Sequence, residues 1–256
     1  MRVAALYDIH GNLPALEAVL DEVRQAGVDH VVVGGDVVPG PMVRETLTRL
    51  LDLDLPVQLI LGNCEVAVLD LLAGRDPGPL PEPVLEAFRW TTEQLPEYEP
   101  VFASWPKTLR LDIPGLGEVL FCHGTPRHEN EIFTCLTAED RLLPVFAGLN
   151  VPLVVCGHTH MQFDRKVGET RVVNAGSVGM PFGEPGAWWL LLGPDVELRR
   201  TLYDLTQAAQ SFRETSYPLA ADFAQETLQP RSESEMLALG ARAELRYGPE
   251  PTGASG

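Results

Sequence analysis

Apolar runs and helical patterns alternate along the first third of the chain. Short runs of apolar and β-branched residues predict buried strands at 2–7, 30–34 and 57–61. Residues 13–27 carry apolar side chains at helical spacing, with Asn12 as a candidate N-cap and Gly27 at the end. A second helix is predicted at about 42–53. This alternation indicates an α/β arrangement.

The second half of the chain is richer in strands. The same criteria predict strands at 108–112, 117–122, 151–156, 162–167, 170–174, 187–192 and 196–202. A turn at Pro114-Gly115 and short connections between the later strands favour mostly antiparallel pairing. A helix is predicted at 137–148, and 66–106 is expected to be helical and exposed around a Pro/Gly-rich insertion at 76–83. We therefore expect two sheets packed face to face, with helices outside.

Length and pattern together indicate one core with a C-terminal extension. A chain of 256 residues can bury one substantial core, which we place in residues 1–202. After Tyr203 the pattern becomes helical and acidic, which predicts a helical appendage over 203–248 that packs on the domain. Residues 249–256 are expected to form a flexible tail.

Composition narrows the class of protein. A hydrophobic content of 45% is typical of a folded globular chain, and no run approaches the roughly 20 apolar residues of a membrane span. The first residues lack the apolar region of a signal peptide. We expect a cytoplasmic protein without a membrane partner, whose four cysteines are reduced thiols. Whether it forms a homo-oligomer is left open.

The net charge of −17 restricts the partners. An acidic protein repels nucleic acid backbones and anionic lipids, so nucleic acid is not expected as a partner. A small phosphate-ester or nucleotide substrate would need a local positive centre that the overall field does not supply. A pair of metal ions would be such a centre.

Seven polar residues follow predicted strands, where α/β sheets place their ligands. They are Asp8, His10, Asp36, Asn63, His123, His158 and His160. Taken singly, each is typical of a turn, a helix cap or a loop. Taken together, two carboxylates, four imidazoles and an amide form the mixed set that divalent ions accept, and seven ligands are too many for one ion. We therefore predict two divalent metal ions, with His158 and His160 binding one each because side chains two apart on extended backbone diverge.

The charge of such a site suits a phosphate ester. Two divalent ions contribute +4, the two carboxylates remove 2, and a bridging hydroxide leaves a net charge of about +1. The paired ions would generate the hydroxide and hold the ester oxygens, so no nucleophilic side chain is needed. The residues therefore predict hydrolysis of a phosphate ester by metal-bridged hydroxide.

The order of these motifs resembles a known family. Asp8-x-His10, Gly35-Asp36, Gly62-Asn63, His123 and Gly157-His158-x-His160 resemble the calcineurin-like metallophosphoesterase superfamily, in its small bacterial and archaeal phosphodiesterase-like branch. The resemblance implies an α/β (α+β) fold, a four-layer αββα sandwich of two mixed sheets flanked by helices. It implies one metal on Asp8, His10, Asp36 and His160. The second metal would lie on Asn63, His123 and His158, with Asp36 bridging.

One position departs from the family pattern. Where the family often has a histidine that protonates the leaving group, this chain has Cys64. The thiol either packs beneath the site or acts there as a proton donor or ligand. Glu65 is expected to orient a ligand histidine. Arg127 and His128 follow His123 and are candidates to reach the substrate, His128 as a replacement acid.

Three functions fit these features. The leading prediction is a phosphodiesterase acting on a small or nucleotide substrate. A nucleotide polyphosphate hydrolase or nuclease is the alternative within enzymes, and a non-catalytic scaffold with the same fold is the third. Mn²⁺ is the expected metal, and Fe²⁺, Zn²⁺, Co²⁺ or Ni²⁺ would also suit the ligand set.

Overall fold

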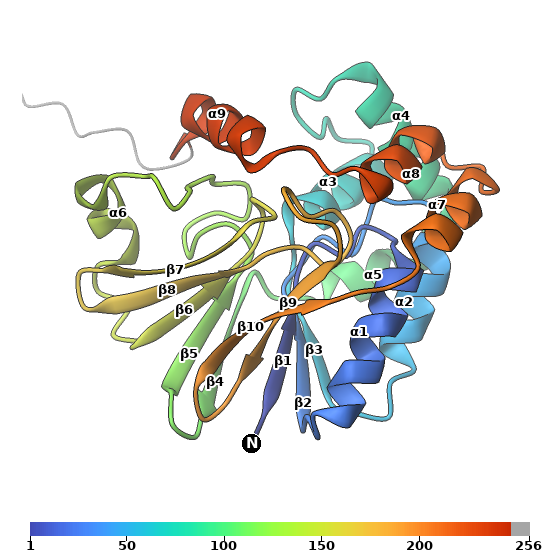
Figure 1. The fold of residues 1–256 in the computed structure, drawn as a ribbon. Coiled ribbons are helices and arrows are strands. Elements are labelled where there is room, and N and C mark those ends of the chain that lie inside the picture. The colour runs from blue at the N-terminus through green and yellow to red at the C-terminus, as the bar shows by residue number, and fades with distance from the viewer. Residues whose placement is uncertain (247–256) are drawn as a thin grey trace, which may run out of the picture.

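Two five-stranded sheets form the centre of the molecule, which we describe from a computed structural model for residues 1–246. Sheet A contains β1 (Val3–Leu6), β2 (His30–Val33), β3 (Val57–Leu59), β9 (Ala187–Leu192) and β10 (Val196–Thr201), in the order β10-β9-β1-β2-β3. Strands β1, β2 and β3 run parallel, and β9 and β10 extend the sheet antiparallel to β1. The carboxyl ends of these parallel strands therefore lie at one edge of the sheet, toward the top of the view in Figure 1.

Sheet B carries the second group of strands. It contains β4 (Thr108–Ile113), β5 (Gly117–Cys122), β6 (Leu153–Cys156), β7 (Gln162–Val167) and β8 (Thr170–Ala175), in the order β4-β5-β6-β8-β7. The outer pairs β4·β5 and β7·β8 are antiparallel, as expected from their short connections. The central strand β6 instead pairs parallel with both β5 and β8, so the expectation of mostly antiparallel pairing is wrong for the middle of this sheet. The reason is that the chain crosses over between β5 and β6 through a helix, which returns it in the same direction.

Helices cover the outer face of each sheet, which confirms the predicted four-layer order. On sheet A lie α1 (Leu13–Gln25), α2 (Val43–Leu51), α3 (Asn63–Leu72), α4 (Glu82–Gln94), a 3-10 turn (Pro96–Tyr98) and α5 (Glu99–Ala103). Helix α6 (Glu139–Phe146) packs on the outer face of sheet B through Leu142, Val145 and Phe146. The layers are separated in Figure 1, with α1 and α2 on one side and α6 on the other.

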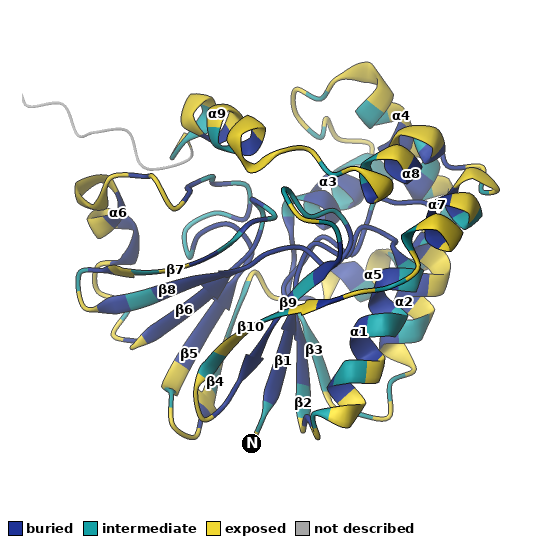
Figure 2. Cartoon of the chain, viewed as in Figure 1, coloured by how far each residue is buried: buried dark blue, intermediate teal, exposed yellow. Residues whose placement is uncertain are grey.

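Side-chain alternation along β1 fixes which residues face which layer. Ala4 and Leu6 point to the helices, whereas Val3, Ala5 and Tyr7 point to sheet B and pack in the cluster between the sheets. All five are fully buried, and Figure 2 shows the sheets as the most buried part of the molecule. A strand enclosed on both faces is rigid, so the residues that follow it are held in place.

Between β10 and residue 246 the chain forms three helices, α7 (Leu205–Arg213), α8 (Ala220–Leu228) and α9 (Glu233–Ala243). Helices α7 and α8 pack on α4 through a cluster that includes Ala87, Phe212 and Phe223. In Figure 1 they lie at the edge where the parallel strands of sheet A end. Within residues 1–246, every helix is too short or too polar to span a bilayer. The predicted flexible tail, 249–256, lies outside the described residues.

Candidate metal centre

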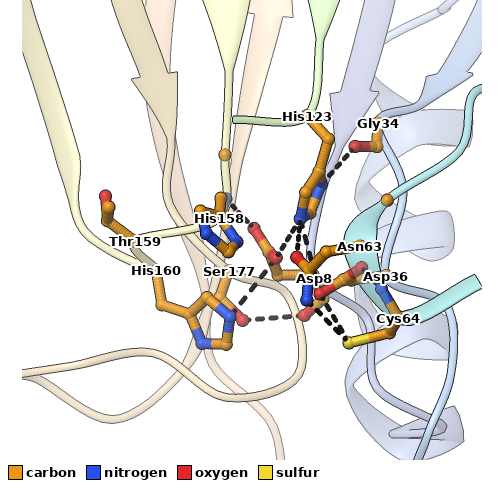
Figure 3. A network of polar contacts seen from close by, with 12 residues as sticks. Asp8, Gly34, Asp36, Asn63, Cys64, His123, His158, Thr159, His160 and Ser177 are labelled. Carbon is orange, nitrogen blue, oxygen red and sulfur yellow. Dashed lines mark hydrogen bonds and ion pairs between the residues drawn. The ribbon is translucent and has the colours of Figure 1, made fainter. Parts of the chain in front are cut away.

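The seven predicted ligand residues come together where the strands of both sheets end. Figure 3 labels six of them, all but His10, and shows their side chains converging from the two sheets. Sheet A supplies residues from the ends of β1, β2 and β3, and sheet B supplies them from the ends of β5 and β6. The complete set is Asp8, His10, Asp36, Asn63, His123, His158 and His160. All but Asn63, His158 and His160 are buried, and these three are half-buried.

Short distances link the carboxylates to the imidazoles. His123 Nε2 lies 3.4 Å from Asp36 Oδ2 and 3.7 Å from Asp8 Oδ1. His160 Nε2 lies 3.3 Å from Asp8 Oδ1 and 3.2 Å from His10 Nε2. His10 Nε2 is 3.9 Å from Asp36 Oδ2. Ligands of one ion with bonds of about 2 Å stand about 3–4 Å apart, so these separations suit shared coordination.

Among the described residues, three groups of side chains have the geometry to hold an ion, and one of them includes Cys64. They are Asp8, His10 and His160; then His10, Asp36 and Cys64; and finally Asp36, His123 and His158, with the ligand atoms of each group within 4.8 Å of one another. His10 and Asp36 each belong to two of the groups. Asn63 joins the last group, because its Oδ1 lies 3.0 Å from His123 Nε2.

The buried donor atoms also fit a cation. Asp8 Oδ1 and His158 Nε2 are buried without a hydrogen-bond partner in the described part of the chain. The Nδ1 atoms of His123 and His160 donate to the carbonyls of Gly34 and Met180, at 2.8 and 2.7 Å. These bonds turn the Nε2 atom of each ring into the cluster, as metal-binding histidines require. Buried polar atoms without partners are costly, and a bound cation would satisfy them.

The two carboxylates depend on positive charge from their neighbours. Burial opposes ionisation of Asp36, but His123 and His10 bring the pKa of its carboxyl below the usual range. For Asp8 too, burial is outweighed by His160 and His123, and its pKa is lowered. Burial favours the neutral form of His123, yet the carboxylates raise its pKa to about 10. Unit charges 3.4 Å apart attract by about 5 kcal/mol at an effective dielectric constant of about 20.

The pKa values of His10 and His158 show that both rings are in the form that binds metals. Burial, assisted by neighbouring imidazoles, lowers the pKa of both His10 and His158 to about 4. Both rings are neutral at pH 7 and present a lone pair, which is the metal-binding form of imidazole. Divalent ions would replace the proton that the carboxylates hold on His123.

The backbone of the cluster adopts unfavourable conformations. Positive φ angles occur at Asp8 (53°), His10 (49°), Asp36 (54°), His158 (67°) and His160 (56°). Outside glycine, the described residues contain only two further positive φ angles, both away from the cluster. Each left-handed residue costs about 1 kcal/mol or more, a cost typical of functional sites.

Two glycines allow the strand ends to approach one another. A Cβ atom on Gly62 would lie 2.1 Å from Asp36 Oδ1, and one on Gly157 would lie 2.6 Å from Asp8 Oδ2. No side chain tolerates such distances. The glycines that precede Asn63 and His158 are therefore steric requirements of the cluster.

Glu65 holds the backbone beside the cluster. Its Oε2 accepts hydrogen bonds from the backbone N–H groups of Asp36 and Gly62, both at 2.8 Å, and its Oε1 accepts those of Val37 (2.7 Å) and Val38 (3.3 Å). Burial and the Asp36 carboxylate raise the pKa of Glu65 to about 7, and the backbone donors oppose that shift. The expectation that Glu65 orients a histidine is wrong, because four backbone donors use its two oxygens.

Of the remaining predicted residues, Cys64 lies at the cluster, whereas Arg127 and His128 do not line the cavity over it. The Cys64 thiol donates to Asp36 Oδ2 at 2.9 Å, and burial together with Asp36 raises its pKa well above the ordinary value. Cys64 is therefore a neutral thiol at the cluster. Arg127 forms a bidentate ion pair with buried Glu131. Within the described residues, neither Arg127 nor His128 lines the cavity over the cluster, so their predicted contact with substrate has no support from its lining.

That cavity reveals residues that the sequence did not single out. It has a volume of about 730 Å³ and is open to His10, Asp36 and His160 on one side. Its other walls come from α4, from α8 and from the segment that ends at Arg231. The strand-end motifs do not extend to α8. Its sequence is that of an ordinary surface helix with mixed charge, which does not indicate a position beside the cluster. Proximity in the fold alone identifies these residues.

Glu65→Gln tests the backbone clamp. The variant replaces one acceptor oxygen by an NH₂ group, which leaves two buried N–H donors unsatisfied. We expect the free energy of unfolding, measured by urea denaturation, to fall by about 2–3 kcal/mol. Glu118→Gln, at an exposed ion pair with Arg110, is the matched control and should change it by less than about 0.5 kcal/mol. Equal values for the two variants would refute the clamp.

Comparisons with known proteins agree with this geometry. The sequence profile of the Calcineurin-like phosphoesterase superfamily domain matches residues 1–192. An uncharacterized protein of Methanocaldococcus jannaschii is 26% identical over 249 residues, which cover 84% of this chain and 93% of that protein. The crystal structure of a metallophosphoesterase from Sphaerobacter thermophilus is similar with a TM-score of 0.69 and 30% identity, covering 89% of this chain and 98% of that one.

A hypothetical protein from Pyrococcus horikoshii OT3 shares the fold as well. Its crystal structure gives a TM-score of 0.74 at 20% identity, covering 88% of this chain and 97% of that one. The family profile spans three quarters of the chain, including strands β1 to β9 and all seven converging residues. The resemblance inferred from the strand-end motifs is confirmed: the chain belongs to the calcineurin-like phosphoesterase superfamily.

Proposed function

We propose that the protein is a dinuclear metal-dependent phosphodiesterase that hydrolyses diesters or activated phosphate esters of a small or nucleotide substrate. The observation that carries the proposal is the cluster itself: buried carboxylates and imidazoles form overlapping groups of ion-binding geometry. His10 and Asp36 each belong to two groups, and Asp36 is the carboxylate that lies both with His10 and with His123 and His158. A carboxylate placed between two sets of ligands is what a bridging ligand requires. Membership of the superfamily supports a metal-dependent phosphoesterase.

The ligand assignment follows the two ends of the cluster. Asp8, His10 and His160 would hold one ion, and Asn63, His123 and His158 the other, with Asp36 between them. Once bound, the two ions would activate water and neutralise charge on the phosphate. The described residues would do the positioning. Carbonyls orient the rings, Glu65 holds the Asp36 backbone, and the left-handed conformations aim the ligands inward.

The identity of the ions depends on the ligand set and on supply. Carboxylate, imidazole and amide ligands suit Mn²⁺, which we propose as the native metal, and Fe²⁺, Zn²⁺, Co²⁺ or Ni²⁺ would also bind. Cys64 would favour softer ions if it became a ligand. Its hydrogen bond to Asp36 instead supports a neutral thiol that steadies the bridging carboxylate.

The two alternatives have less support. A polyphosphate hydrolase or nuclease would need several cationic side chains near the cluster. Among the described residues that line its cavity, Arg231 is the only lysine or arginine, and the chain carries a net charge of −17. A non-catalytic scaffold would have no need to keep strained, buried ligands at a cost of about 1 kcal/mol each.

Metal removal tests the activity. We expect the Mn²⁺-loaded protein to hydrolyse bis-p-nitrophenyl phosphate, and activity to fall at least about a hundredfold after chelation, because a metal-generated nucleophile has no protein substitute. Readdition of Mn²⁺ should restore it. A p-nitrophenolate release assay on the chelated and reloaded protein measures both. Metal-loaded protein without turnover would favour the scaffold.

Asp36→Asn tests the bridge. Loss of the shared carboxylate should lower the bound metal from two ions per chain to at most one, measured by elemental analysis after gel filtration, because both sites lose a ligand and the neutralising charge. Asp112→Asn, at an exposed position on β4, is the control and should keep two. Two ions retained in Asp36→Asn would exclude a bridging role.

Cys64→His tests the departure from the family pattern. A histidine at this position would supply a proton to poor leaving groups, whereas p-nitrophenolate leaves without one. We expect kcat for an alkyl ester such as glycerol phosphate to rise about tenfold or more, with kcat for the p-nitrophenyl diester changed less than about threefold. Cys64→Ser is the size-matched control. Loss of activity on both substrates would mean that Cys64 supports the metals or the packing.

A further inference from the structure

The cavity over the metal cluster has a wall that the family profile does not cover. One side consists of cluster residues, and the opposite side is built by α8 and the chain up to Arg231, beyond the matched residues 1–192. Figure 1 shows α8 lying over the strand ends beside α4. We call residues 217–231 the C-terminal wall. A substrate that fills the cavity would contact it.

One part of the wall is apolar and preformed. The apolar side chains that line the cavity here and on facing α4 are Val84, Phe88, Tyr217, Leu219 and Phe223. Phe223 is 5% exposed and packs edge-to-face on Phe212, with ring centroids 5.1 Å apart. The ring of Tyr217 lies edge-to-face with that of Phe223, with centroids 6.4 Å apart. Aromatic side chains held in this way offer a fixed surface to a planar group.

The other part of the wall is charged. Arg231 lines the cavity and pairs with Glu226, with Nε 2.8 Å from Oε1. The backbone of this arginine is anchored, because its carbonyl accepts from Gly183 N at 2.8 Å. Asp222 lies on the same side of the cavity. One cation and two carboxylates give this side a net charge of −1.

A second, smaller hollow adjoins the first. Its volume is about 160 Å³, and it shares His160, Met180, Phe223, Glu226 and Arg231 with the larger cavity. Phe223 and Arg231 therefore stand where two hollows meet, and both hollows reach a residue of the cluster. A phosphodiester carries two organic groups on one phosphorus, and two hollows joined at the cluster match that shape.

We propose that the C-terminal wall determines the substrate class, and that it selects a monoanionic phosphodiester with a planar, uncharged ring such as a nucleoside or aryl group. This inference rests on the proposed function. Arg231 binds the single negative charge of the diester, and the ring packs against the aromatic surface that includes Phe223. Asp222 and Glu226 repel the additional charge of monoesters and polyphosphates, because one arginine already shared with Glu226 cannot compensate it.

Three substrates with one leaving group test the selection. Methyl p-nitrophenyl phosphate is a small monoanionic diester, thymidine 5′-(p-nitrophenyl phosphate) adds a nucleoside, and p-nitrophenyl phosphate is the dianionic monoester. A shared leaving group removes differences in proton donation. With the Mn²⁺-loaded full chain, we expect kcat/KM to be about tenfold or more higher for the thymidine diester than for the methyl diester, and lowest for the monoester.

Two exposed residues of the wall provide the variants. Arg231→Gln should raise KM for both diesters about tenfold while kcat changes less than about twofold, because it removes one charge-assisted contact and leaves the cluster intact. Asp222→Asn should raise kcat/KM for the monoester relative to the methyl diester by about threefold. The controls are Arg213→Gln and Glu214→Gln, at exposed positions on or just after α7 outside the cavity lining. They should change neither quantity.

The outcomes separate the two proposals. Turnover with equal kcat/KM for the two diesters, or with KM unchanged in Arg231→Gln, overturns the inference about the wall and leaves the phosphodiesterase standing. A metal-loaded wild-type chain that hydrolyses none of the three substrates overturns the proposed function and the inference together. A KM increase of the same size in Arg213→Gln would mean that overall charge, rather than the wall, is responsible, and would also overturn the inference.

Discussion

The structure depends on the burial of two carboxylates, Asp8 and Asp36, at the place where two sheets meet. An isolated buried carboxylate is too costly to remain ionised, so positive charge must stand beside it. The fold provides it at His123 and His160, which come from the opposite sheet and whose pKa values are raised, and His123 lies within 4 Å of both carboxylates. Each such pair attracts by about 5 kcal/mol. The carboxylates therefore stay ionised only because the second sheet brings these imidazoles beside them.

The parallel strands bring the carboxylates and imidazoles close together. Parallel pairing places the carboxyl ends of β1, β2 and β3 at one edge of sheet A, and the ends of β5 and β6 at the facing edge of sheet B. Strands β1, β2 and β6 and the second half of β5 are buried, so apolar packing holds their ends in place. Glu65 then fixes the loop after β2 through three backbone hydrogen bonds and accepts a fourth from Gly62, after β3. The left-handed conformations at the ligands persist because this surrounding structure determines them more strongly than their own preference does.

Much of this arrangement could be predicted from the sequence, and the limits have physical reasons. Strand positions and the convergence of the seven polar residues follow from apolar runs that end in Asp, Asn or His, since strand ends share an edge. The parallel pairing of β6 was missed because short connections dominate the neighbouring strands. The role of Glu65 was mistaken because its partners are backbone N–H groups, which every residue but proline carries. The wall from α8 to Arg231 could not be predicted, because its approach to the cluster depends on packing between α4 and α8.

The residues that would hold ions and the residues of the C-terminal wall lie in parts of the chain that differ in rigidity. Residues that would hold ions lie on strand ends that packing makes rigid, whereas Arg231 and Asp222 are exposed and belong to a segment joined to the core mainly through α4. Substitutions at exposed positions usually change stability by less than about 0.5 kcal/mol. The wall can therefore vary in charge and shape without disturbing the strained cluster. If the cluster performs the chemistry and the wall selects the substrate, as we propose, the two properties would depend on parts of the chain that tolerate change to different degrees.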